Sequence, residues 1–69
     1  MKNKIDDLTN EEIRHIIELC VHSERDREIL SLRLTDGLTY EQIAEHVGMS
    51  VRQISRIVPK LQDKLYKHL

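Results

Sequence analysis

The spacing of small and apolar residues in TYEQIAEHVGMSVRQISRI, residues 39–57, constrains the fold more than any other feature of this chain. Ala44 is small enough to let a second helix approach closely, and Gly48 accepts the left-handed backbone conformation of a tight turn. Ser50 offers its hydroxyl to the free N–H groups that open the next helix. The facing apolar residues are Ile43, Val47, Ile54 and Ile57. This register predicts a helix-turn-helix, with an ordinary pair of bundle helices as the alternative.

Four helix starts are indicated by a hydroxyl residue placed three positions before a polar acceptor. The pairs are Thr9 with Glu12, Ser23 with Asp26, Thr39 with Gln42, and Ser50 with Gln53. With stops at Gly37 and Gly48, they predict helices over residues 10–21, 24–35, 40–47 and 51–67. Strand signals are absent. We therefore expect residues 1–69 to form a single, small, all-α domain of four helices that contains the helix-turn-helix.

Three of these helices carry an apolar stripe at helical spacing. The stripes are Ile13, Ile16, Ile17 and Cys20; Ile29, Leu30 and Leu34; and Ile54, Ile57, Val58, Leu61 and Leu65. Cys20 is the only cysteine, so it cannot form an internal disulfide. Its position on a stripe favours a buried thiol over a reactive one.

Pro59 interrupts the last predicted helix, because it has no N–H to donate to the Ser55 carbonyl and its ring crowds the preceding turn. The apolar stripe nevertheless keeps its phase across this position. We expect the last helix to be kinked at Pro59, with the DNA-contacting part ending near Val58. The alternative is a helix boundary with Pro59 at the first position of a new helix.

The charge of the chain is divided unevenly along its length. Residues 50–69 carry five basic residues and one acid, a net charge of +4. Residues 1–49 carry six basic and eleven acidic residues, a net charge of −5. A basic second helix after a helix-turn-helix register is what contacts to DNA phosphates require, and the acidic remainder disfavours binding through another face.

The basic residues of the last helix also recur at helical spacing, on the side opposite the apolar stripe. They are Arg52, Arg56, Lys60 and Lys64, with Lys67 on the same side. A solvated charged face is the alternative interpretation of such a ridge. Lys60 and Lys64 lie beyond Pro59, so we expect them to contact only the phosphates of double-stranded DNA.

The segment from Ser23 to Leu65 resembles the fourth region of bacterial sigma factors, and more distantly the LuxR-type DNA-binding domains. The resemblance rests on the E-R-x-R-x-I-L-x-L-R pattern of residues 24–33 and the G-L-T-Y-E-Q-I-A pattern of residues 37–44. Pro59 departs from the family pattern, and the other sigma regions have no counterpart. We therefore expect a small regulator, phage-encoded or carried on a bacterial mobile element, rather than a full sigma factor.

The resemblance implies that residues 51–58 enter the major groove as a recognition helix. On this basis the base-contacting residues are Arg52, Gln53 and Arg56, and those at the phosphates are Thr39, Tyr40 and Ser50. The partner it implies is double-stranded DNA, alone or together with RNA polymerase.

Catalysis, metal binding and membrane insertion are not indicated by any motif. The four histidines, His15, His22, His46 and His68, lie on separate predicted elements without zinc-finger spacing. Neither a phosphate-binding glycine loop nor a nucleophile elbow occurs, so we expect no enzyme and no cofactor. The sequence has no apolar run near 18 residues, and MKNKIDDL lacks a signal core. We expect a cytoplasmic location.

Two further expectations concern partners. The net charge of −1 and pI near 6.4 are low for a DNA-binding protein, which keeps open an adaptor or inhibitor that docks on RNA polymerase or another nucleic-acid enzyme. A homodimer is also expected, because one recognition helix covers too few base pairs for useful specificity. The apolar residues expected at its interface are Leu19, Val21, Leu65, Tyr66 and Leu69.

Overall fold

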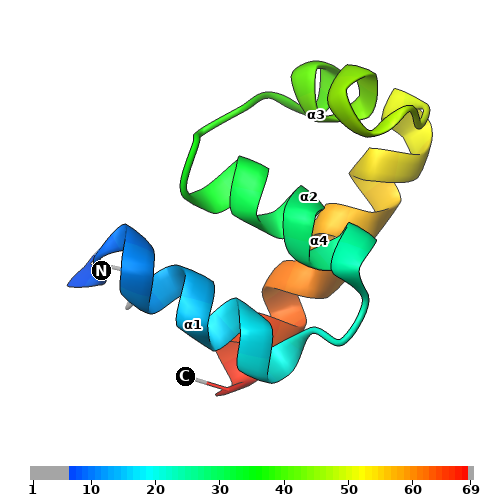
Figure 1. Cartoon of the computed structure of the whole chain (residues 1–69). Coiled ribbons are helices and arrows are strands. Elements are labelled where there is room, and N and C mark those ends of the chain that lie inside the picture. Colours follow the sequence, from blue (N-terminus) through cyan, green and yellow to red (C-terminus); the bar gives the residue numbers. More distant parts are fainter. Residues whose placement is uncertain (1–6, 69) are drawn as a thin grey trace.

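The computed structural model describes residues 7–68, which form four helices and no strand (Figure 1). The helices are α1 (Asn10–Cys20), α2 (Glu24–Leu34), α3 (Tyr40–Val47) and α4 (Val51–His68). Each begins at the predicted residue and ends within one residue of the predicted end. The predicted all-α, four-helix fold is confirmed.

Side-chain caps explain why the helix starts were predictable. The Thr39 N–H donates to Gln42 Oε1 at 2.9 Å, and the Gln42 N–H donates back to the Thr39 hydroxyl at 3.1 Å. Thr9 with Glu12 and Ser50 with Gln53 form the same reciprocal pair. At Ser23 the hydroxyl accepts from the Asp26 N–H, but no bond returns from the shorter Asp26 side chain.

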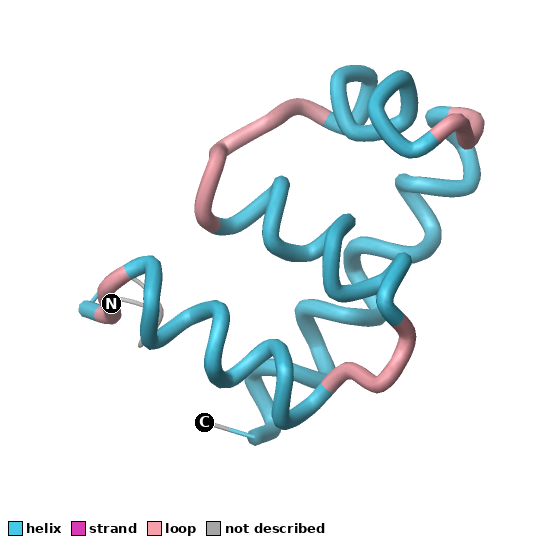
Figure 2. Tube along the Cα trace, viewed as in Figure 1, coloured by secondary structure: helices cyan, strands magenta, loops and turns pink. Residues whose placement is uncertain are grey.

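The turn between α3 and α4 is three residues long and depends on Gly48. Gly48 has φ 74° and ψ 34°, the left-handed conformation that costs a residue without Cβ least. The Met49 N–H then donates to the Ala44 carbonyl at 2.9 Å, which closes the end of α3. Figure 2 shows this short turn, in contrast to the longer loop that joins α2 to α3. The predicted helix-turn-helix is present.

Helices α2 and α4 lie at the centre of the molecule, and each contacts the other three helices. Figure 1 shows α3 beside the first turns of α4 and α1 beside its last turns. None of the polar side chains of residues 7–68 is buried. Eleven apolar residues are buried between the helices: Ile13, Ile17, Val21, Ile29, Leu30, Ile43, Ala44, Ile54, Val58, Leu61 and Leu65. The predicted inner stripes supply most of this core.

Two of the residues expected at a dimer interface belong to the core instead. Val21 is 2% exposed and Leu65 is 1% exposed, so their assignment as dimer contacts is wrong. Val21 lies at the corner between α1 and α2, where helical periodicity no longer indicates the direction of a side chain. Leu19 and Tyr66 remain exposed, and Leu69 lies outside the described residues.

Helix α4 continues through Pro59, which is exposed, from Val51 to His68. The alternative of a helix boundary at Pro59 is therefore wrong. The Ser55 carbonyl loses its usual N–H partner, but Pro59 lies on the side of α4 away from the core, where water can take that bond. Val58 and Leu61, on either side of Pro59, both pack into the core. This shared packing stabilises one continuous helix.

Candidate nucleic-acid interface

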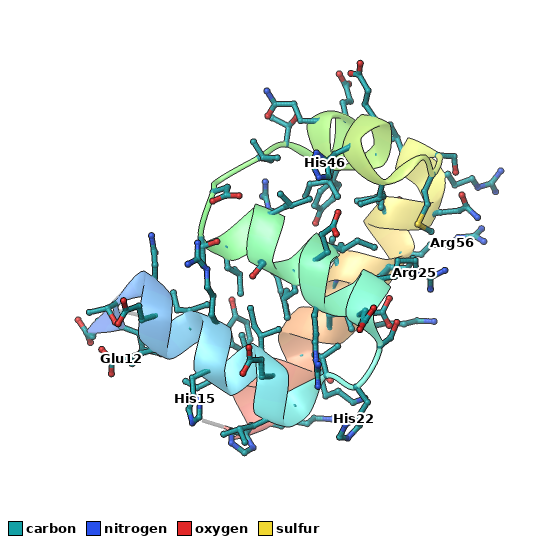
Figure 3. All side chains as sticks on the ribbon, viewed as in Figure 1. Glu12, His15, His22, Arg25, His46 and Arg56 are labelled. Carbon is teal, nitrogen blue, oxygen red and sulfur yellow. The ribbon has the colours of Figure 1, made fainter. Side chains whose placement is uncertain are left out.

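The first two turns of α4 present two guanidinium groups to solvent. Ile54 and Val58 are fully buried, and the exposed Arg52 and Arg56 lie on the opposite side of the helix. Within residues 7–68, neither guanidinium has a hydrogen-bond or ion-pair partner. Figure 3 shows Arg56 at the periphery of the molecule. Both groups are therefore available as forked donors, one helical turn apart.

The Gln53 side chain is already engaged by the cap of α4. Its Oε1 accepts from the Ser50 N–H at 3.0 Å and lies 3.2 Å from the Ser50 hydroxyl. Bidentate pairing with adenine uses both the oxygen and the nitrogen of an amide side chain. The cap thus competes with base contact for the same oxygen, and only the amide nitrogen of Gln53 is without a partner among the described residues.

Ser55 is an exposed polar residue of this surface that sequence analysis did not select. It precedes Arg56 and lies nearly one turn after Arg52, and its hydroxyl donates to the Arg52 carbonyl at 2.8 Å. This bond uses the hydroxyl proton and leaves the oxygen lone pairs free to accept from a base amino group. In the sequence, the feature that could have indicated Ser55 is its position on the basic side of the last helix.

Farther along α4, the exposed Lys60 and Lys64 have no acidic partner within residues 7–68, whereas Lys67 is 3.2 Å from Asp63. Lys64 also lies near Cys20 of α1. Burial raises the pKa of the half-buried Cys20 thiol, and the positive charge of Lys64 opposes that rise. Because the ordinary value is already 9.0, the thiol stays protonated at neutral pH and is a weak nucleophile.

An open depression of about 450 Å³ lies beside the start of α3 and reaches the start of α4. It is lined by Arg33, Thr39, Tyr40, Glu41 and Val51. The Arg33 guanidinium lies 5.0 Å from the centre of the Tyr40 ring and donates to the Leu38 carbonyl at 2.9 Å. These contacts hold the loop before α3 against α2, which fixes where Thr39 and Tyr40 are placed.

A second contact between α2 and α3 joins His46 to Glu28. His46 Nε2 lies 3.2 Å from Glu28 Oε1, and Figure 3 shows His46 on the side of α3 that faces α2. The helix-turn-helix is thus attached to α2 by polar contacts at both ends of α3, as well as by the core. Arg33 and Val51 were not selected from the sequence, because their neighbours come from different helices.

Other chemistry has no visible site in the described part of the chain. Residues 7–68 contain no group of three or more His, Cys, Asp or Glu side chains placed to hold a metal ion. Within the same residues, no helix is both long enough and apolar enough to cross a lipid bilayer.

The exposed arginines, the capped start of α4 and the glycine turn define a helix-turn-helix of the kind that binds DNA. Comparison with known families gives the same result, because residues 23–67 match the family model described as "Sigma-70, region 4". The chain belongs to the sigma-70 region 4 family, and it is a DNA-binding helix-turn-helix domain of transcription.

Curated relatives include the RNA polymerase sigma factor SigF of two Mycobacterium tuberculosis strains, CDC 1551 / Oshkosh and ATCC 25618 / H37Rv. Each is 38% identical to this chain over 66 residues, which cover 94% of the chain. The match spans only 24% of the length of either relative. No solved structure matches the chain significantly.

Proposed function

We propose that this protein is a sequence-specific regulator of transcription that inserts residues 51–58 of α4 into the major groove of double-stranded DNA. The observation that carries the proposal is the pair of exposed, unpartnered guanidiniums on Arg52 and Arg56, opposite the buried side of α4. A guanidinium can donate two parallel hydrogen bonds to the O6 and N7 atoms of guanine. Two of them about 6 Å apart along a helix can reach guanines on neighbouring base pairs.

The remaining assignments divide into base and phosphate contacts. Gln53 contributes its free amide nitrogen to an acceptor on a base edge. Thr39, Tyr40 and Ser50 are assigned to phosphates, because they lie at the starts of α3 and α4, where the helix dipole favours an anion. Lys60 and Lys64 extend the contact along the DNA backbone, because they follow the arginines on the exposed side of α4.

The regulator is proposed to be of phage or mobile-element type and to act in the cytoplasm, without catalysing a reaction. RNA polymerase is proposed as a second partner, because the curated relatives are RNA polymerase sigma factors. The segment before α3, residues 1–38, carries six basic and nine acidic residues, a net charge of −3. This charge supports the division, since acidic side chains are repelled by DNA and attract a basic protein. An adaptor that docks on polymerase without contacting DNA is the alternative.

The proposal is tested by incubating the purified protein with a pool of random duplexes and sequencing the fraction that it retains. Recovery of a defined sequence, hereafter the selected duplex, supports specific binding of double-stranded DNA. Recovery of an unenriched pool, or of no DNA at low salt, would leave the adaptor as the better account. The Arg52→Ala, Arg56→Ala double variant is the control, and it should enrich no sequence.

We also propose that the protein binds its site as a homodimer, with Leu19 and Tyr66 at the interface. They are 53% and 41% exposed, and pairing would remove this apolar surface from water. We expect a dimeric mass by analytical ultracentrifugation at high micromolar concentration, free or on a two-half-site duplex. Replacing Leu19 by Glu should shift the mass toward the monomer. A monomeric mass of the unmodified protein in both states would contradict the proposal.

A further inference from the structure

Val51 is an exposed apolar residue at the start of the proposed recognition helix. It is the first residue of α4 and is 44% exposed. Arg52, Gln53, Ser55 and Arg56 are the other exposed side chains of residues 51–58, and all of them are polar. A single exposed apolar residue is ordinary on a protein surface, so the inference depends on where Val51 lies.

Val51 lies between the two groups of proposed DNA contacts. It lines the depression beside α3 together with Thr39 and Tyr40, and it precedes Arg52 directly in the chain. Around the helix axis Val51 lies about 100° from Arg52 and about 40° from Ser55, on the side of α4 that faces the start of α3. If Arg52 contacts a base and Thr39 meets the backbone, Val51 faces the edge of the major groove between them.

From this position we infer that Val51 contacts the 5-methyl group of a thymine. This thymine belongs to the base pair next to the guanine bound by Arg52. The inference rests on the proposed function. The thymine methyl is the apolar feature of the major groove, and apolar side chains recognise it by direct contact. It lies at the groove edge nearest its own backbone, and Val51 lines the same depression as Thr39, a proposed backbone contact. Contact would bury both this methyl group and the exposed Val51 side chain.

The inference predicts a methyl-dependent affinity that requires Val51. In the selected duplex, each thymine is replaced in turn by deoxyuridine, which removes only the methyl group. At one position per half-site we expect the unmodified protein to bind about fourfold more weakly, the amount that one buried methyl group supplies. Val51→Ala should bind the thymine duplex about fourfold more weakly than the unmodified protein and should no longer distinguish thymine from uracil there.

Two further arms separate the sources of the effect. Val51→Thr keeps one of the two γ-methyl groups and should retain part of the preference for thymine over uracil. At the sensitive position, a 5-methylcytosine–guanine pair should bind more tightly than a cytosine–guanine pair, because both carry the same hydrogen-bonding groups and differ only in the methyl. If 5-methylcytosine binds no more tightly than cytosine at that position, the protein does not recognise the methyl group itself, and the Val51 contact is overturned.

Failure of the inference differs from failure of the proposed function. If the protein enriches no duplex, DNA recognition itself fails, and the inference fails with it. If a duplex is enriched and Arg52→Ala weakens it, but no uracil substitution changes the affinity, only the Val51 contact is overturned. If replacing thymine by deoxyuridine weakens binding equally in the unmodified protein and in Val51→Ala, another residue makes the methyl contact. The Val51 contact is then overturned as well. Val51 is exposed and Ala has the higher helix propensity, so Val51→Ala should fold.

Discussion

Replacing Ile54 by Ala is expected to lower the free energy of unfolding by about 2–5 kcal/mol, the usual range for a large side chain removed from a packed core. Ile54 is 0% exposed and belongs to the α4 side of the helix-turn-helix. It packs in the same cluster as Ile43 and Ala44 of α3. Small domains have a few kcal/mol of stability in reserve, so this one substitution removes much of it.

The loss is measured by urea unfolding, followed by the far-ultraviolet circular dichroism of the helices. Glu45→Ala is the matched control, because Glu45 is an exposed residue of α3 and surface substitutions usually change stability by less than about 0.5 kcal/mol. A loss below about 1 kcal/mol for Ile54→Ala would contradict the packing between α3 and α4 described above.

The second large effect is expected on DNA binding. Replacing Arg52 or Arg56 by Ala should reduce the affinity for the selected duplex by about 1–3 kcal/mol and relax the preference at one or two base pairs. Both arginines are exposed, and neither guanidinium has a hydrogen-bond or ion-pair partner among the described residues, so the substitutions should not change folding. Lys60→Ala and Lys64→Ala should weaken all duplexes about equally and reduce the salt slope by about one unit each.

The four variants are compared on the selected duplex and on a scrambled duplex of the same composition. If all four lose the same affinity on both duplexes, α4 binds DNA only through its charge. The assignment of Arg52 and Arg56 to bases would then be wrong.

The helix boundaries could be predicted because local chemistry determines them. Thr39 and Gln42 satisfy each other's backbone groups within one turn, and Gly48 supplies the left-handed residue that ends α3. These interactions span at most a few residues, so the sequence alone indicates them. The inner stripes were predictable for the same reason, since one helix side must face the core.

The corner between α1 and α2 could not be predicted in this way. Val21 follows the last turn of α1, and its carbonyl accepts a hydrogen bond from Arg27 Nε of the next helix. Arg27 also donates to the Glu18 carbonyl at 3.1 Å, so one side chain closes the C-terminal end of α1. This closure turns Val21 inward. It depends on the packing of two helices, which a periodic pattern along one helix does not describe.

The candidate site was predictable in part, for a similar reason. The spacing of Arg52 and Arg56 indicated an exposed basic side of α4, and the structure shows both exposed. Gln53 was assigned both to the cap and to a base, although one oxygen serves the cap. The positions of Val51 and Arg33 beside α3 could not be predicted from the sequence, because the depression that they line is formed by three separate segments.

The central claim, that α4 binds and reads double-stranded DNA, is tested most directly by titrating salt against affinity for the selected and scrambled duplexes. We predict that the logarithm of the association constant falls linearly with the logarithm of salt concentration on both, with a slope of about −2 or steeper from the Lys60 and Lys64 phosphate contacts alone. Because base hydrogen bonds release few counterions, the preference for the selected duplex should persist as salt rises. No binding at low salt, or equal affinity for both duplexes throughout, would contradict the account.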